Sequence, residues 1–425
     1  DRLQFGPTGA KRRFAPTNTL ALPLPQVTRP LLLLGLMSRD IARRRLLRCT
    51  WVGALPPAVR VRFVLGEGSP APDSDRHDVI VLPIAEQSSG TGRISTYLKV
   101  MGFMRYAATQ PEPLVAKGDD DIFVVPQMLA AYAALLTRLA AQPGREHLVA
   151  GTFDWFNFKP ATLDTVGWGR MRAGAALVSS PSLVAPQLRN RCRGNGFCNC
   201  SAGGGGYVYD GWDLTEARQP REPRLDKRTC VGPFAFANGA LKFFSTATVR
   251  WLVRSEAFEA DIRYAEELAN ASAGGDGGGG GGSGGGTTAR WRRRERRRGR
   301  SEDGGGSERP RLAARVSEDA QLGVWLAALP SLHLVVFKRF EGWLNSFHHV
   351  GDLRHLLVAH RTPWDLYAWL LRHTTALWRD ATELRVHTKC TPSPPCKECL
   401  HHQSQTTCAL HTKLRVRRGG TRVNC

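Results

Sequence analysis

The sequence predicts one large α/β domain built around a mixed central sheet. Short apolar or β-branched runs alternate with segments of helical periodicity between residues 29 and 141, as expected when strands and helices follow one another in turn. The chain has 425 residues, 42% of them hydrophobic, which suffices for a substantial core. Three aspartates directly follow one apolar run, and open α/β sheets bind their ligands beyond the carboxyl ends of strands.

The elements expected in the first half follow from local signals. Residues 1–28 are rich in Pro, Thr and Arg and are expected to form a stem or tail. Ser38 is a candidate N-cap for a basic helix that runs to Trp51. The expected strands are 31–37, 59–66, 79–82 and 114–117, and the other expected helices are 93–109 and 127–141.

The second half is less regular. Residues 183–232, with clustered cysteines and glycines, are expected to form a loop region, and 232–239 a turn followed by a strand and a helix capped near Ser245. Residues 274–310 are mostly Gly, Arg and Ser and predict a disordered insertion, because they cannot bury enough apolar area to fold. A further helix is expected from Asp319 to Leu329. The domain is therefore expected to comprise residues 29–273 and 311–385, followed by a Cys/His-rich appendage at 386–425.

The charge of the chain is strongly positive but unevenly distributed. A formal net charge of +22 and a pI of about 10.2 would suit a polyanionic partner. However, 11 arginines and 4 acidic residues lie between Arg290 and Arg315, so much of the excess is local. One alternative is thus a polyanion-binding protein that acts through this Arg-rich insertion, although nucleic acid is not the partner we expect.

The ten cysteines bear on the cellular compartment. Close-spaced cysteines in loop-like sequence indicate disulfides in an oxidising compartment or a zinc site in a reducing one. Cys396 and Cys399, with histidines nearby, could form a zinc knuckle, but the flanks lack a second CxxC pair and disulfides are preferred. Glycosylation sequons at Asn199 and Asn270 agree with a secretory route. The apolar run at 31–37 is too short to cross a membrane.

The aspartate triplet at 119–121 is the most informative motif. Adjacent carboxylates repel one another, and a divalent cation can compensate that repulsion. Hard oxygen ligands of this kind suit Mg²⁺ or Mn²⁺ bound to phosphate oxygens. A solvated acidic turn is the alternative that needs no ligand. A metal-dependent phosphohydrolase or nuclease would need further carboxylates at recognisable spacing, which the chain lacks.

Seven segments occur in a recognisable order. They read RRLLRCTW at 44–51, Glu86, YLK at 97–99, KGDDDIFV at 117–124, GPFAFANG at 232–239, EDAQLG at 318–323 and VAHRTPWDLYAW at 358–369. They resemble the RRxxIRxTW, lone Glu, NLTLK, KxDDDxFV, YPxYxxG, EDVxxG and VHxxxPxxMxxxW motifs of the beta-1,3-galactosyltransferase family. The resemblance covers roughly residues 31–375. It departs from the family pattern at Ala320, at 95–97 and within 232–239, which bears on sugar specificity more than on reaction type.

The resemblance implies a glycosyltransferase A-type fold with a Rossmann-like nucleotide-binding half. It also implies an inverting transfer, with Mn²⁺ as cofactor, of a hexose from a UDP-sugar to a glycan or glycoprotein acceptor. Galactose is the favoured hexose, with N-acetylglucosamine as the alternative in the same family. Members of the family work in the Golgi lumen and attach to the membrane through an N-terminal anchor, which is not present in this chain.

The resemblance also implies roles for individual residues. Asp319 would be the catalytic base, next to Glu318, because inversion requires deprotonation of the acceptor hydroxyl on the face opposite the leaving group. Asp119, Asp121 and His360 would hold the metal ion, since imidazole suits Mn²⁺ better than Mg²⁺. The residues that would bind the donor are Arg45, Arg48, Lys99, Lys117, Asp119, Asp120 and Gly239.

Without the family pattern, each of these residues has an ordinary structural explanation. His360 would be a packed or surface histidine, and Glu318 with Asp319 an acidic pair that interacts with a helix dipole. Arg45 and Arg48 would lie on a solvated basic helix face. Trp51 is assigned to the core, and Phe234 and Phe236 fit either core or pocket. Most of the later tryptophans are expected to pack, although some could stack on sugars, namely Trp325, Trp343, Trp364 and Trp369.

Overall fold

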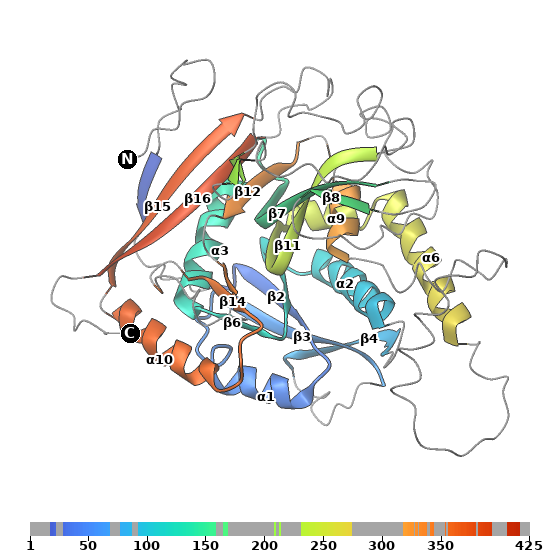
Figure 1. Cartoon of the computed structure of the whole chain (residues 1–425), viewed down its shortest axis with the longest axis horizontal. Helices are drawn as coiled ribbons and strands as arrows, with labels where there is room; N and C mark the ends of the chain where they lie inside the picture. Colours follow the sequence, from blue (N-terminus) through green and yellow to red (C-terminus); the bar gives the residue numbers. More distant parts are fainter. Residues whose placement is uncertain are drawn as a thin grey trace.

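The central element of the computed structural model is a mixed sheet of 11 strands (Figure 1). The structure describes residues 18–22, 29–68, 77–86, 92–158, 165–168, 208–209, 212–213, 231–273, 318–326, 328–329, 331–337, 341–343, 353, 356–379, 381–392 and 406–416. The expected insertion at 274–310 and most of the expected loop region at 183–232 lie outside these residues.

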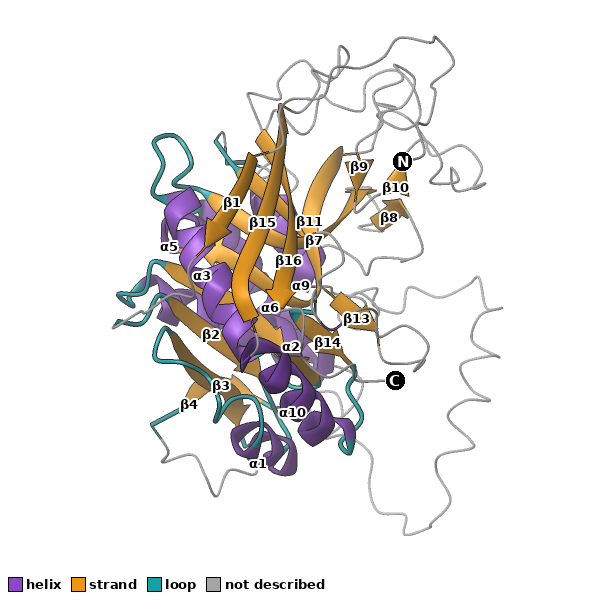
Figure 2. Ribbon diagram, turned by 90° about the vertical axis from the view of Figure 1, so that its left-hand side faces the viewer, coloured by secondary structure: helices purple, strands orange, loops and turns teal. Residues whose placement is uncertain are grey.

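The strand order is β1-β15-β16-β12-β7-β11-β5-β2-β3-β4, with β8 beside β7. Figure 2 shows β1, β15 and β16 toward one end of this order and β2, β3 and β4 toward the other. Strands β5, β2, β3 and β4 are mutually parallel, as are β7, β12 and β16, whereas β11 is antiparallel to β5 and β7. The strands are β1 (Asn18–Leu22), β2 (Leu32–Met37), β3 (Val59–Glu67), β4 (Val79–Ala85), β5 (Leu114–Asp119), β7 (Leu148–Phe158), β8 (Thr165–Trp168), β11 (Val231–Ser245), β12 (His333–Phe337), β15 (Ala381–Pro392) and β16 (Thr406–Val416). The α/β prediction is confirmed, and the parallel part is compatible with a Rossmann-like half.

A second sheet has the order β13-β14-β6, and a small hairpin pairs β9 (Val208–Tyr209) with β10 (Trp212–Asp213). The second sheet is formed by β13 (Glu341–Trp343), β14 (Val358–His360) and β6 (Ile122–Val124). The helices are α1 (Ile41–Cys49), α2 (Gly92–Ala108), α3 (Pro126–Ala140), α5 (Thr246–Leu252), α6 (Glu256–Ala273), α9 (Glu318–Leu326) and α10 (Leu366–Arg379).

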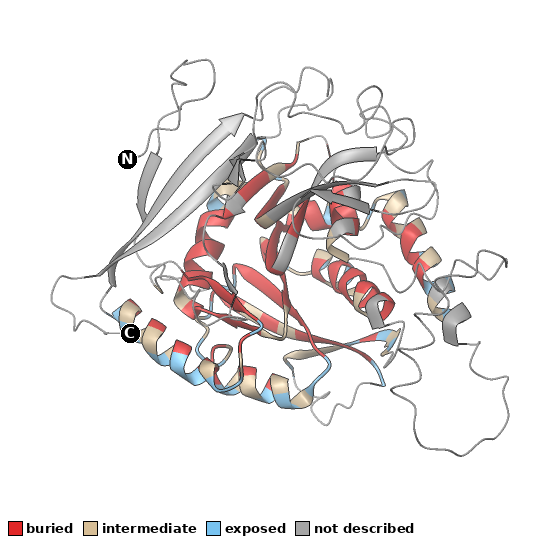
Figure 3. Cartoon of the chain, viewed as in Figure 1, coloured by how far each residue is buried: buried red, intermediate tan, exposed pale blue. Residues whose placement is uncertain are grey.

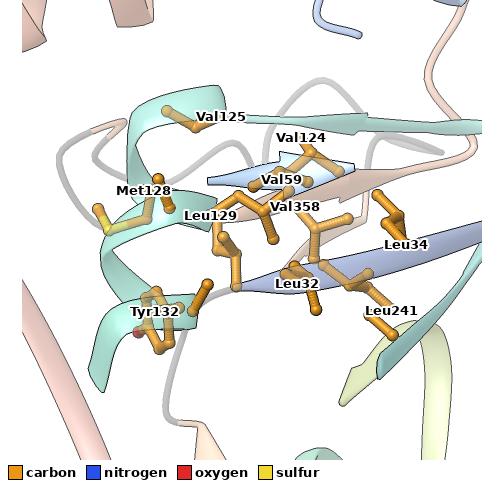
Figure 4. Packing of buried hydrophobic residues seen from close by; sticks show 14 of the residues in the cluster. Leu32, Leu34, Val59, Val124, Val125, Met128, Leu129, Tyr132, Leu241 and Val358 are labelled. Carbon is orange, nitrogen blue, oxygen red and sulfur yellow. The ribbon is translucent and has the colours of Figure 1, made fainter. Parts of the chain in front are cut away.

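Helices cover both faces of the central sheet, because successive residues of a buried strand point to opposite sides. Leu32, Leu34 and Leu36 of β2 belong to one hydrophobic cluster, together with buried residues of α1, α3 and α10. Leu33 belongs to the other, with residues of α2, α5, α6 and α9. The buried residues line the strands and the inner sides of these helices (Figure 3). Figure 4 shows the first cluster, in which Met128 of α3 and Leu32 take part.

Two helix caps test the sequence analysis. Ser245 caps α5 as expected, since its side chain accepts from Thr248 N. The expected cap of α1 is wrong, because Asp40 and not Ser38 caps it, accepting from Ala42 N at 2.8 Å. Helix α1 consequently starts later than expected and ends at Cys49. Ser38 is thereby available for a tertiary hydrogen bond.

The segment 232–239 is not a turn. It is part of the long strand β11, which pairs with β7 over its first half and with β5 over its second. The pairing of β11 with β7 has two register shifts, one between Val231 and Phe234 and one between Asn238 and Phe243. Pairing with β7 satisfies backbone groups of this segment, so an extended conformation replaces the turn.

The two ends of the described chain join the central sheet. Residues 18–22, within the expected stem, form β1, which pairs with β15. Strands β15 and β16 lie largely within the expected appendage, yet β16 pairs in parallel with β12 and extends the sheet. The antiparallel pair of β15 and β16 covers the edge of β12, whose backbone groups would otherwise be unpaired.

Within the described residues, none of the helices combines the length and the apolar character needed to cross a membrane.

Candidate functional site

The aspartate triplet forms the tight connection between β5 and β6. Asp119 is the last residue of β5, and β6 begins at Ile122. Two hydrogen bonds hold this backbone from outside: Thr362 N donates to Asp121 O at 3.0 Å, and the indole of Trp51 donates to Ile122 O at 3.0 Å. Trp51 is fully buried, so its assignment to the core is confirmed. The carboxylates are therefore presented by a fixed segment of backbone.

His360 reaches the triplet through strand pairing. It is the last residue of β14, and its partner in the antiparallel ladder is Ile122 of β6. Its Nε2 lies 3.5 Å from Asp121 Oδ1 and 4.0 Å from Asp119 Oδ2. One ligand atom from each of the three residues lies within 4.8 Å of the other two. We call Asp119, Asp121 and His360 the Asp-His group.

The Asp-His group could hold a metal ion. Two carboxylates and an imidazole are ligands that suit Mn²⁺ and related divalent ions. In the described part of the chain, the contact of the buried Asp121 Oδ1 is the long one with His360 Nε2, at 3.5 Å. A buried oxygen of this kind is costly unless something else binds it. Burial alone would raise the pKa of Asp121, but His360, Arg43 and Arg361 lower the pKa below its ordinary value, which favours the ionised form that a metal requires.

Asp120 differs from its two neighbours. It accepts a hydrogen bond from the Ser38 hydroxyl at 2.8 Å, at the end of β2. Burial raises the pKa of Asp120 despite this hydrogen bond. The structure therefore places Asp120 against Ser38 and outside the Asp-His group, and its assignment to donor binding stays a prediction.

Lys117 connects the triplet to helix α9. Its side chain is only 1% exposed, and its Nζ lies 2.6 Å from Asp119 Oδ1 and 3.4 Å from Glu318 Oε1. Glu318 is the first residue of α9, and Asp319 follows it. The residues expected to bind metal and the residue expected to act as base thus lie in one continuous cluster of charges.

Asp319 is paired with a second buried lysine, which the sequence analysis did not single out. Lys242 of β11 is fully buried, and its Nζ donates hydrogen bonds to Asp319 Oδ1 and to Ala237 O. We call Glu318 and Asp319 the lysine-paired carboxylates. The sequence signal for Lys242 was its position inside a predicted strand, because a lysine buried in a strand needs a negatively charged partner.

The lysine-paired carboxylates differ in their pKa shifts. Burial raises the pKa of Asp319 above its ordinary value, opposed by Lys242 and assisted by the adjacent Glu318 carboxylate. For Glu318, burial is outweighed by Lys117 and Lys242, so its pKa is lowered. Although burial acts to lower it, the pKa of Lys117 is raised by Asp119, Glu318 and Asp319, so this lysine stays charged. Asp319 is therefore the better proton acceptor of the two.

Helix α9 is held in place by a buried aspartate of α6. Asp261 accepts from Gln321 Nε2 at 3.0 Å and from the indole of Trp325 at 2.9 Å. Trp325 also packs against Phe258 and Tyr97, so the expectation that this tryptophan packs is confirmed. These contacts fix the N-terminus of α9, and with it the lysine-paired carboxylates.

The other predicted basic residues, Arg45, Arg48 and Lys99, lie on α1 and α2 and have different surroundings. Arg45 is exposed on α1. Arg48 forms a two-pronged ion pair with Asp78, at 2.8 and 3.0 Å, and Lys99 is buried against Glu86, with Nζ to carboxylate distances of 2.8 and 2.9 Å. Lys99 Nζ also approaches Ser38 O at 3.5 Å, which places it near Asp120's hydrogen-bond partner.

Arg43 is the arginine of α1 that acts on the triplet, and sequence reasoning missed it. Its charge lowers the pKa of Asp121 and opposes the rise at Asp120, and its guanidinium lies 5.5 Å from the ring centre of Trp364. Recognising Asp40 as the cap would have identified Arg43, since it then falls in the first turn. Trp364 and Trp369 are among the exposed large hydrophobic residues.

Three residues singled out from the sequence stay untested: Gly239, Phe234 and Trp343. Gly239 lies in β11, close to the register shift that follows Asn238. Phe236 is buried, whereas the side chains of Phe234 and Trp343 lie outside the described set.

Comparison with known proteins adds no identification: no protein-family model matches the chain, and no curated protein matches it either.

Proposed function

We propose that this chain is an inverting hexosyltransferase that uses a UDP-sugar donor, with Mn²⁺ at the Asp-His group. The acceptor is a hydroxyl of a glycan or glycoprotein, the linkage is beta-1,3, and galactose is the preferred sugar, with N-acetylglucosamine as the alternative. The proposal also places the protein in the Golgi lumen. The observation that carries it is the contact of Lys117 with both Asp119 and Glu318, which joins a metal-binding group to a paired base candidate.

The chemistry assigns a different task to each group. Mn²⁺ held by Asp119, Asp121 and His360 would neutralise the charge that develops on the departing diphosphate. Asp319 accepts the proton of the acceptor hydroxyl, and its raised pKa brings it closer to the working pH than an ordinary aspartate. Arg43, at the edge of the triplet, adds positive charge where the phosphates would lie.

The direct test is UDP release from a panel of UDP-sugars, with Mn²⁺ or with a chelator, in the presence and absence of candidate acceptors. We expect release that depends on Mn²⁺ and rises with a suitable acceptor. Glu259→Gln is a matched control, because Glu259 forms an exposed ion pair with Arg105 and should leave release unchanged. The absence of release from every UDP-sugar, with all acceptors tried, would contradict the proposal.

A further inference from the structure

Two buried lysines face each other beneath α9. Lys117 of β5 and Lys242 of β11 are directly opposite in the antiparallel ladder, and their side chains are 1% and 0% exposed. Two ammonium groups this close and this deeply buried repel each other unless carboxylates neutralise them. Lys117 is matched by Asp119 and Glu318, and Lys242 by Asp319. The two lysines therefore serve different carboxylates.

Lys242 ties three parts of the structure together. Its Nζ donates to Asp319 Oδ1 at the start of α9 and, at 3.0 Å, to Ala237 O. Ala237 precedes the register shift of β11, and Lys242 itself lies within the shifted stretch between Asn238 and Phe243. The same ammonium thus connects the irregular part of the strand to the helix N-terminus, and fixes where the carboxylate lies.

Apart from Lys117, which is already paired with Asp119 and Glu318, the surroundings of Lys242 offer no substitute for it. Beside it lies a small cavity whose other lining residues are apolar, Leu322 and Leu326 of α9 and Leu334 of β12 among them. Water in an apolar cavity finds few hydrogen-bond partners, so it cannot readily replace the ammonium group. Removal of the lysine should leave Asp319 poorly neutralised.

We propose that Lys242 is a positioning residue for Asp319: it occupies Oδ1 with a charge-assisted hydrogen bond and leaves Oδ2 to take the acceptor proton. This inference rests on the proposed function. In the step, the proton of the acceptor hydroxyl moves to Oδ2, and the oxygen electron pair forms the bond to the anomeric carbon. The bond from that carbon to the diphosphate oxygen breaks, and its electron pair leaves with UDP.

The test compares Lys242→Met with the wild type by steady-state kinetics over a range of pH. The charged groups that face Asp319 are Lys242 from β11, Lys117 from β5 and Glu318 beside it on α9. Loss of the Lys242 charge leaves only Lys117 and the Glu318 carboxylate facing Asp319. The ionised form of Asp319 is then less favoured, so its pKa rises further. We expect kcat to fall about 10- to 100-fold, KM for the UDP-sugar to stay within about twofold, and the acid limb of the kcat profile to move to higher pH.

Arg60→Met is the matched control. Arg60 pairs with Glu112 at 2.6 Å, at the amino end of β3 and far along the strand from the Asp-His group. Its loss removes an ion pair and lowers stability, but the acid limb should not move. Lys242→Gln, which keeps a donor but no charge, should shift the acid limb in the same direction as Lys242→Met. If Lys242→Met does not fold, Lys242→Gln decides the question.

The outcomes separate the two proposals. A wild type that releases no UDP contradicts the proposed function, and with it this role of Lys242. Suppose instead that the wild type is active and that Lys242→Met has the same kcat and the same acid limb. This result overturns the inference about Lys242 alone, and Lys242→Gln takes the place of Lys242→Met if only that variant folds. Equal shifts in Arg60→Met would show a general loss of stability and would also overturn it.

Discussion

The two acidic groups that Lys117 joins balance their negative charge in different ways. The lysine-paired carboxylates are neutralised by cations of the chain itself, Lys117 and Lys242. In the Asp-His group, Lys117 serves one oxygen of Asp119, whereas the buried Asp121 Oδ1 has the imidazole of His360 3.5 Å away and no lysine partner among the described residues. The difference teaches that each lysine-paired carboxylate is bound directly by a lysine, whereas the Asp-His group is arranged so that it could also bind a metal ion.

The same contrast appears in the pKa shifts. Neighbouring positive groups hold the pKa of Asp121 below its ordinary value, although burial acts against them. Burial raises the pKa of Asp319. A metal ligand must be ionised, whereas a base works best when its pKa approaches the working pH. Two carboxylates pushed in opposite directions are the pattern expected of residues with different chemical tasks.

Asp319→Asn tests the base side of the comparison, with the largest expected effect. The amide keeps the shape of the side chain but accepts no proton, so the transfer rate should fall about 10²- to 10⁴-fold. UDP binding in the presence of Mn²⁺ should persist, because the Asp-His group is unchanged. Steady-state transfer assays and calorimetric titration with UDP measure the two quantities. A fully active Asp319→Asn variant would disprove the base assignment.

Asp121→Asn tests the metal side. Loss of a charged ligand should weaken Mn²⁺ binding by about 100-fold or more, since even residues that only support metal ligands contribute about 10- to 100-fold. Titration calorimetry with Mn²⁺ in the presence of UDP measures this. Asp319→Asn serves as the counterpart variant: if both substitutions weaken Mn²⁺ binding equally, the two groups do not differ as described.

Thermal unfolding with and without Mn²⁺ tests whether the ion binds at the Asp-His group. An ion that binds only the folded state at about 100 times its dissociation constant adds about 2.7 kcal/mol to the free energy of unfolding. We expect Mn²⁺ to raise the Tm of the wild type, a chelator to reverse the rise, and Asp121→Asn to abolish it. A rise of equal size in Asp121→Asn would place the ion elsewhere.

Ser38→Ala probes the aspartate that belongs to neither group. Removal of the hydroxyl deprives Asp120 of a hydrogen bond and should lower the free energy of unfolding by about 1 kcal/mol. Urea denaturation measures the change, with Thr109→Ala as the control, because the hydroxyl of Thr109 makes only exposed hydrogen bonds, to Tyr106 O and from Gln110 Nε2. Loss of Mn²⁺ binding in Ser38→Ala would show that Asp120 belongs with the Asp-His group after all.

Local sequence signals predicted most of the first half. The strand expected at 114–117 became β5 and the helix expected at 127–141 became α3, each with small differences at its ends. The errors fell where two local explanations competed. Ser38 and Asp40 can both cap a helix, and the segment 232–239 contains residues typical of turns, yet pairing with β7 keeps it extended.

The sequence by itself determined the α/β class, the aspartate triplet and a helix near Asp319, because apolar periodicity, helix ends and adjacent carboxylates are local properties of the chain. The choice of Asp319 as the candidate base came from the family resemblance. Only the tertiary structure decided which cation balances which carboxylate. Lys117 and Glu318 are 201 positions apart, and Lys242 and Asp319 are 77 apart. Such partners meet because β5 pairs with β11 and α9 packs against β11, and no local pattern encodes that meeting.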